Sequence, residues 1–248
     1  MLFRRISAHL KRQDWFAVGL DLLIVVVGIY IGLQVDAWNS ARQDRVVERE
    51  YFERLLHDME ESIAAQRYVI DEFDSSINAM DYLAQRLREG SFDSADDALI
   101  YAGIDALGWV VSPVTNMVTV RELQSTGKIS LIRDIPIRKA IGQLELSYSE
   151  AQFSASRNQS LISTSMPEIM TWVYLPPTRA IGEYRSVPGD ISYGTTQEPD
   201  YVRMLENPVS GTVVSWISAW SKFHATNLAN HQEETIRFRD LLLERLEQ

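Results

Sequence analysis

Histidine and acidic side chains in unusual surroundings are the residues of this chain that could do chemistry. The four histidines are His9, His57, His224 and His231, and the sequence contains no cysteine. A thiolate nucleophile, a disulfide and a cysteine-bound metal are therefore all excluded. His57 has acids within one helical turn on both sides. That arrangement could bind a metal, but it is more typical of solvated pairs on a helix surface.

A polar interruption occurs in the last apolar helical seam of the chain. The seam is apolar before and after His224, Asn227 and His231. If this helix runs antiparallel beside a helix of residues 41–89, His231 lies level with Gln66, the one polar residue of that second seam. We expect a polar layer of these four side chains inside a bundle. Such a layer could fix helix register, bind a small ligand or hold a metal.

The stretch 15–33 is long and apolar enough to cross a membrane. It contains one charge, Asp21, and Trp15 and Trp38 flank it as interfacial aromatic residues do. At ~1.5 Å per residue it spans roughly 28 Å, close to the hydrocarbon thickness of a bilayer. A cleaved signal peptide is the alternative, with a small-residue cleavage site at Val35-Asp36-Ala37, but the apolar stretch is longer than such peptides usually have. The sequence therefore predicts a transmembrane helix over 15–37, with the bilayer as its first partner.

One face of this helix combines the charge with small residues. Asp21, Val25, Gly28 and Gly32 follow spacings of four and three, so they share one stripe. Small residues let helices approach closely in lipid, and an intramembrane carboxylate seeks protein or water. We interpret the stripe as an interface with another helix. Two other interpretations stay open: Asp21 snorkels to the cytoplasmic surface, or it carries a proton.

Periodicity and breaker residues predict an all-α chain whose transmembrane helix continues into a bundle of long helices. The predicted helices are 41–89, 94–108, 112–126, 136–165, 199–206 and 209–246, with a short extended or turning piece at 128–132. The second of the long seams begins at Pro136. A Pro/Gly-rich loop occupies 176–208.

Aromatic residues gather in or beside that loop. Long ordered loops are commonly functional, and exposed aromatic side chains favour partner contact. The loop aromatics could equally plug the open end of the bundle. The residues concerned are Trp172, Tyr174, Tyr184, Tyr193 and Tyr201.

Three sequence stretches stand out: the anchor end 26–39 (VVGIYIGLQVDAWN), the stretch 121–132 (RELQSTGKISLI) and 205–208 (LENP) before the final helix. In these stretches the chain resembles a bacterial family of unknown function that combines an N-terminal single-span anchor with a helical periplasmic domain. The acid that precedes the anchor core in the family corresponds to Asp21. The resemblance implies the architecture and a periplasmic location, and it implies no activity.

Charge distribution excludes nucleic acid as a partner. Residues 1–38 hold four of the 24 basic and three of the 34 acidic side chains, which leaves 20 basic against 31 acidic in the rest. Phosphate contacts need clustered Lys and Arg. We expect a cytoplasmic head at 1–14, the span at 15–37 and a periplasmic bundle at 38–248, with the protein in the bacterial inner membrane.

The signature motifs of common enzyme classes are missing from the sequence. There is no Gly-x-Ser-x-Gly, phosphate loop, Gly-x-Gly-x-x-Gly or His-Glu-x-x-His. We predict no enzymatic activity, cofactor or metal. The leading hypothesis is an interaction or scaffold protein that binds a membrane partner or forms a homo-oligomer. The alternatives are a ligand sensor that acts through a partner and a single-span ion-motive partner subunit that uses Asp21.

Overall fold

The computed structural model describes residues 15–92, 97–172 and 201–247; for 15–18, Asp97, Trp172 and Tyr201 it describes the backbone alone. The described elements are α2 (Trp15–Glu89), α3 (Asp97–Ala106), α4 (Val118–Ser125), the 3-10 helix η2 (Lys128–Leu131), α5 (Ile135–Trp172), α6 (Tyr201–Glu206) and α7 (Ser210–Leu246). The predicted all-α class is confirmed. The chain divides into two compact units, Met1–Phe52 and Glu53–Gln248.

The first unit contains the apolar beginning of α2. The large apolar side chains from Leu20 to Val35 are 46–65% exposed. An 18-residue window in this helix has a mean hydropathy of 1.9, and none of that window is buried. In the described part of the chain, α2 is the one helix long and apolar enough to cross a membrane.

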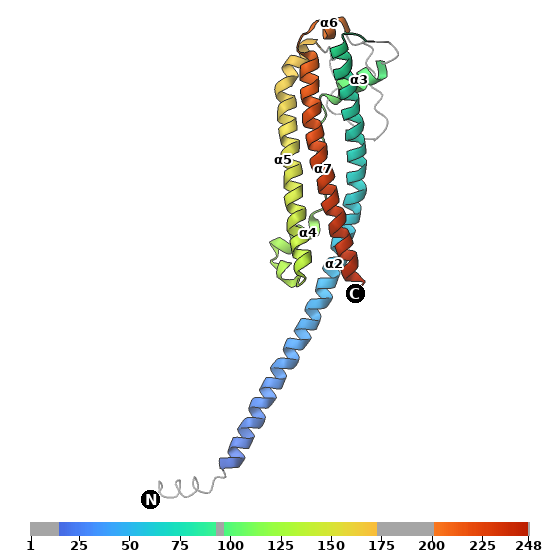
Figure 1. Cartoon of the computed structure of the whole chain (residues 1–248). Helices are drawn as coiled ribbons and strands as arrows, with labels where there is room; N and C mark the ends of the chain where they lie inside the picture. The colour runs from blue at the N-terminus through green and yellow to red at the C-terminus, as the bar shows by residue number, and fades with distance from the viewer. Residues whose placement is uncertain (1–14, 93–96, 173–200, 248) are drawn as a thin grey trace, which may run out of the picture. The chain divides into compact units, whose positions relative to one another are not determined.

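The second unit is built on three long helical segments that run side by side (Figure 1). Arg88, near the end of α2, donates to Ser215, near the start of α7, whereas Gln66 donates to Thr235 much later in α7. The two helices are therefore antiparallel. The helices α5 and α7 are antiparallel too, because Ser147 pairs with His231 and Asn158, later in α5, pairs with Ser221, earlier in α7.

A mixed segment takes the fourth position of this bundle. It begins with α3, which approaches α2 so closely that a Cβ atom on Gly103 would lie 2.6 Å from the Ala79 carbonyl oxygen. The chain then continues without regular structure to the start of α4. Leu107, Val111 and Met117 of this part are buried. The irregular segment 107–117 thus fills the place of a helix in the core.

The predicted helix start at Ser112-Pro113 is wrong, since α4 begins only at Val118. Proline lacks a backbone donor and pushes the preceding residue toward extended conformations, and the β-branched residues around it add to this preference. The segment 107–117 instead bonds to side chains of α2 and α7. The piece predicted at 128–132 turns as a 3-10 helix, after Gly127 with φ 71°.

The structure extends α5 beyond its predicted end near Ser165 and keeps it helical through Pro167 to Trp172. A proline in a helix removes one backbone hydrogen bond. Burial of Ile162 and Ile169 in the main core stabilises the helix on both sides of it. The predicted ends of α2 at Glu89 and α7 at Leu246, and the short helix α6, are confirmed.

Candidate functional site

A chain of polar side chains crosses the bundle interior at the level of His231. Gln66 Nε2 on α2 donates to Thr115 Oγ1 and to Thr235 Oγ1, both at 3.1 Å. Thr115 Oγ1 lies 2.6 Å from His231 Nε2, and Ser147 Oγ on α5 lies 2.8 Å from His231 Nδ1. The segment 107–117 and α5 thus contact one imidazole of α7, and α2 is linked to it through Thr115. We call these five side chains the polar layer.

The hydrogen bonds define which atoms of this layer carry protons. The Ser147 hydroxyl donates to the Leu144 carbonyl, so Ser147 Oγ accepts from His231 Nδ1–H. His231 Nε2 then accepts from Thr115, whose oxygen is already an acceptor for Gln66. Every contact around the ring is satisfied when His231 is neutral.

Burial also favours the neutral form of His231. The His231 side chain is buried, and desolvation lowers its pKa from 6.5 to about 4. The Tyr148 ring lies 5.5 Å from the imidazole, centroid to centroid. Protonation of His231 would place a charge in this interior, where it costs stability.

His224 forms a second level two turns earlier in α7. Its Nε2 donates to the Val111 carbonyl at 2.8 Å, and its Nδ1 lies 2.7 Å from Ser154 Oγ. The Phe73 ring packs edge-on at 5.4 Å. Burial lowers the pKa of His224, and the bond to Val111 partly opposes this effect. Both histidines therefore hold the segment 107–117 against α7 and α5.

Two buried amide oxygens of the bundle have no hydrogen-bond partner among the described residues. They are Gln66 Oε1 and Asn158 Oδ1. The Asn158 amide nitrogen donates to Ser221 at 3.2 Å, so half of that side chain is satisfied. An unpaired buried oxygen costs about 1–3 kcal/mol. These unpaired oxygens lower the free energy of unfolding, while the polar contacts around them specify how the helices are aligned.

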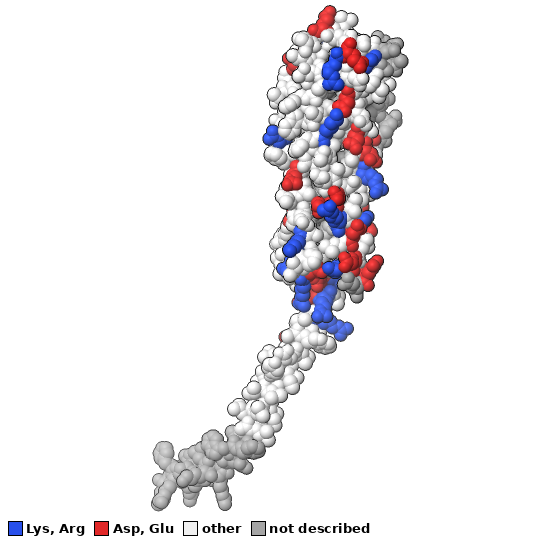
Figure 2. All heavy atoms as spheres, viewed as in Figure 1, with Lys and Arg blue, Asp and Glu red and all other residues white. Residues whose placement is uncertain are grey.

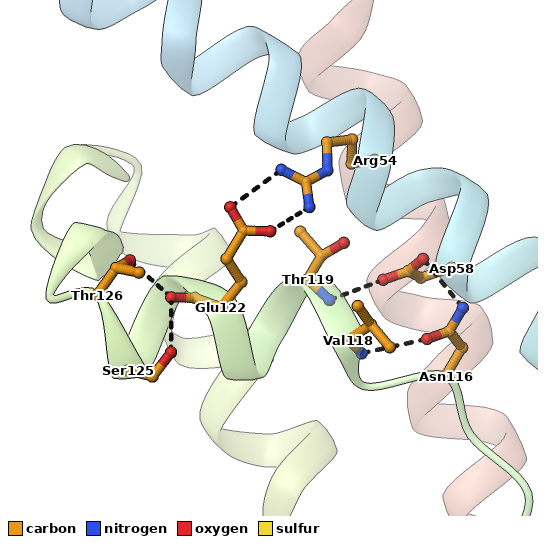
Figure 3. Close-up of polar contacts among 8 residues, drawn as sticks. All are labelled: Arg54, Asp58, Asn116, Val118, Thr119, Glu122, Ser125 and Thr126. Atoms are coloured by element: carbon orange, nitrogen blue, oxygen red, sulfur yellow. Dashed lines mark hydrogen bonds and ion pairs between the residues drawn. The ribbon is translucent and has the colours of Figure 1, made fainter.

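A third polar cluster lies where α4 starts and was not predicted from the sequence (Figure 3). The buried Asp58 on α2 accepts from Thr119 N and from Asn116 Nδ2, each at 3.1 Å. Asn116 Oδ1 accepts from Val118 N. Asp58 thus caps the first turn of a helix that is sixty residues away in sequence. No local capping pattern could have revealed it.

The stretch 121–132 is fixed to α2 at the same corner. Arg54 and Glu122 form a two-pronged ion pair, with Nη1 donating to Oε1 at 3.2 Å and Nη2 donating to Oε2 (Figure 3). The hydroxyl groups of Ser125 and Thr126 donate to the Glu122 carbonyl. The stretch therefore has a structural role at the α2–α4 corner.

The other predicted site residues have different surroundings. Asn227 is not part of the polar layer: it is half-buried, and its amide donates to the Phe223 carbonyl of its own helix. The prediction that it faces the interior is wrong, because its position on α7 turns it toward the rim. His57 is exposed and pairs with Glu61 at 3.3 Å.

Several predicted residues are uncovered or lie outside the described part of the chain. The stripe residues Asp21, Val25, Gly28 and Gly32 are exposed. Tyr174, Tyr184 and Tyr193 of the predicted partner loop, like His9 and the head 1–14, lie outside the described residues. The same holds for the side chains of Trp172 and Tyr201.

The arrangement supports alignment of helices better than a reaction. Each buried histidine faces a serine, as in a nucleophile–base pair, but both ring nitrogens of each histidine are bonded inside the bundle. In the described part of the chain, no group of three or more His, Cys, Asp or Glu side chains could hold a metal ion. Polar groups satisfied in this way specify a unique register.

Comparisons with known proteins give no relative for this chain. No family model, no curated protein and no solved structure matches it. The structure alone defines the class: an all-α protein with one candidate membrane-spanning helix among its described residues.

Proposed function

We propose that the protein is a membrane-anchored interaction or scaffold protein, an accessory subunit of a complex in the bacterial inner membrane. In this proposal, the head 1–14 is cytoplasmic, residues 15–37 span the bilayer and the helical bundle is periplasmic. The observation that carries the proposal is the contrast between uncovered apolar side chains from Leu20 to Val35 and a bundle interior whose polar groups bond to one another. In this proposal, the protein acts through the surfaces that it presents to its partners.

The glycine stripe is the surface proposed to meet a partner inside the membrane. A Cβ atom built on Gly28 or Gly32 meets nothing within 4 Å, so both positions are open to a neighbouring helix. Asp21 lies on the same stripe and gives that neighbour a polar contact in lipid. This favours a helix–helix contact over a free carboxylate at the membrane surface.

Purification of the tagged full-length chain from its own membranes in mild detergent tests this proposal. We expect a membrane protein to co-purify at a fixed stoichiometry, or the chain to elute as a defined oligomer. Gly28→Leu with Gly32→Leu should reduce the retained partner at least several-fold. Ile29→Leu, on another face of the same helix, should leave it unchanged. A chain that elutes alone, with the two variants behaving alike, would contradict the proposal.

A further inference from the structure

The irregular segment 107–117 has few hydrogen bonds of its own backbone. The N–H groups of Leu107, Gly108 and Trp109 donate to carbonyls of α3. From residue 110 to residue 115, the structure shows no backbone–backbone hydrogen bond to any described residue. A stretch of this kind opens at a lower free energy than the helices around it. Its place in the bundle therefore depends on side chains.

Two buried histidines of α7 hold the middle of this segment. His224 Nε2 donates to the Val111 carbonyl, and His231 Nε2 accepts from Thr115. The contact with Thr115 requires Nε2 without a proton, because the proton of the neutral ring is on Nδ1 and donates to Ser147. A second proton would turn Nε2 into a donor. The Thr115 hydroxyl hydrogen would then lose its acceptor beside a buried charge.

Protonation of His224 has a different consequence. Its Nε2 is already a donor, and Ser154 Oγ can accept from a proton on Nδ1. A second proton on His224 therefore breaks no hydrogen bond, and burial alone opposes it. The contact between His231 and Thr115 is the one that a proton disrupts.

The side chains that face the two rings are uncharged. Burial is the one cause that lowers the pKa of His231, and no charged side chain contributes to the lowered pKa of His224. Tyr148 is the one titratable group among the facing side chains. These side chains are Ser147, Tyr148 and Ser154 of α5, Phe73 of α2 and, through Thr115, Gln66 of α2.

Charged groups approach the segment at one end. The segment itself contains no Asp, Glu, Lys, Arg or His, whereas charged side chains lie at many places on the outer surface of this unit (Figure 2). From α2, Asp58 Oδ1 and Glu61 Oε2 accept from Asn116 Nδ2, next to the start of α4. Figure 3 shows the contact between Asp58 and Asn116. On α7, Lys222 pairs with Asp81 of α2, and Glu233 and Glu234 pair with Arg237.

We propose that acid releases the segment 107–117 from the bundle: protonation of the His231 imidazole detaches Thr115, and residues 108–115 leave the interior while α2, α5 and α7 stay packed. The bond between His224 and Val111 is then the one polar contact that residues 110–115 keep with described residues. Release exposes Val111 and Pro113, which are buried, and the helix faces beneath them.

The long helices keep their mutual contacts in the released state. The His231 Nδ1–H donates to Ser147 in both protonation states of the ring. Asn158 of α5 still bonds to Ser221 of α7. Arg88 near the end of α2 still bonds to Ser215 near the start of α7. The inference goes beyond the proposed function and does not depend on it.

The size of the effect follows from the difference in proton binding between the two states. With the segment attached, burial lowers the pKa of His231 from 6.5 to about 4. With the segment released, water reaches the ring and the pKa returns toward 6.5. The released state therefore binds more protons between these two values, and acidification favours it. The equilibrium constant for release should rise about 25-fold from pH 7.5 to pH 5.

Thiol labelling tests this proposal, because the native chain has no cysteine. Val111→Cys places a thiol in the segment, and Val214→Cys makes the same change near the start of α7. Both valines are buried in the main core. The full-length chain in detergent reacts with 4,4′-dithiodipyridine, and each rate is divided by that of the same variant unfolded in urea at the same pH.

For Val111→Cys, this relative rate should rise about 25-fold from pH 7.5 to pH 5. At pH 5 it should exceed the relative rate of Val214→Cys at least about tenfold, because release of the segment leaves the start of α7 packed. Low urea concentrations should accelerate labelling of Val214→Cys more steeply, since global unfolding exposes more surface. Equal relative rates would overturn the proposal, because they would show that the segment opens only when the whole bundle unfolds.

A second change in the Val111→Cys background tests the role of His231. His231→Gln does not titrate and should remove most of the rise in labelling between pH 7.5 and pH 5. His57→Gln, at an exposed position, is the control and should keep the full rise. An unchanged rise in His231→Gln would overturn the proposal. Far-ultraviolet circular dichroism checks folding, and Val110→Cys, at a half-buried position, replaces Val111→Cys if that variant loses helix.

Discussion

The first unit and the interior of the second unit invert the usual distribution of side chains. From Leu20 to Val35, large apolar side chains are exposed. In the bundle, Asp58, Gln66, His224 and His231 are buried. The apolar group lacks cover from the described chain, whereas the polar group is bonded within it. The difference indicates that the beginning of α2 depends on its surroundings and that the bundle supplies its own polar partners.

The largest expected effect concerns the exposed apolar beginning of α2, which the comparison assigns to an apolar environment. Ile24→Arg with Val27→Arg places two charges near the middle of the apolar stretch. At about 2.5–3.5 kcal/mol each, they should oppose insertion by about 5–7 kcal/mol. Most of the protein should then leave the membrane pellet after a carbonate wash. Val46→Arg, at an exposed position later in α2, is the control and should stay in the pellet. Retention of both would refute a membrane-spanning role.

Removal of the Asp58 carboxylate tests whether the buried polar groups depend on one another. Asp58→Ala leaves Thr119 N and Asn116 Nδ2 without their acceptor. The free energy of unfolding should fall by about 2 kcal/mol. Asp71→Ala, at an exposed position on the same helix, should change it by less than about 0.5 kcal/mol. Urea denaturation measures both, and equal losses would mean that the α4 cap is not formed.

Two glycines show how closely the second unit packs. Gly103→Ala puts a methyl group 2.6 Å from the Ala79 carbonyl oxygen and 2.8 Å from Leu83 Cβ. Overpacking of this kind should cost about 1–3 kcal/mol. A Cβ atom on Gly142 in α5 meets nothing within 4 Å, so Gly142→Ala should instead stabilise the chain by about 0.5–1 kcal/mol. A thermal midpoint that moves in the same direction for both variants would be inconsistent with the packing of α3.

The coupling between Gln66 and His231 is a smaller effect with a definite sign. Both side chains bond to Thr115. Each single change to Leu leaves polar atoms of the layer unpaired. The double change should therefore cost about 1 kcal/mol less than the two single costs added. A double-mutant cycle measures this term, and strictly additive losses would show that the two residues do not share the layer.

Helix periodicity predicted much of this structure because it reports on the long helices. The strict seam of 52–87 and the stop at Gly90 predicted the end of α2. Equal rise along antiparallel helices predicted that His231 lies near the level of Gln66, and both side chains bond to Thr115. The same argument misplaced Asn227, since a shift of part of a turn moves a side chain from the core to the rim.

Other features depend on tertiary contacts that no local pattern records. The segment 107–117 is irregular because His224 and Ser62 supply its hydrogen bonds. Asp58 caps α4 from another helix. The end of α5 is stabilised by burial of Ile169 beyond Pro167. Each of these requires residues that are distant in sequence to be placed together first.

The pH dependence of stability tests most directly the claim that His231 is buried as a neutral imidazole that is hydrogen-bonded at both ring nitrogens. A folded-state pKa of about 4 for His231 means that the unfolded chain binds more protons between pH 6.5 and 4. Stability is therefore complete above about pH 6.5 and is lost as pH falls, by about 3 kcal/mol from this residue. The lowered pKa of His224 adds a loss in the same direction.

The measurement is the free energy of unfolding of the full-length chain, from pH 7.5 to 4, for the native sequence and for His231→Leu. We predict that His231→Leu is less stable at pH 7.5 but loses markedly less stability on acidification, so the two curves converge. His57→Leu, at an exposed position, is the control and should follow the native curve. Parallel curves for the native sequence and His231→Leu would contradict the account, because they would show that His231 titrates as a solvent-exposed residue does.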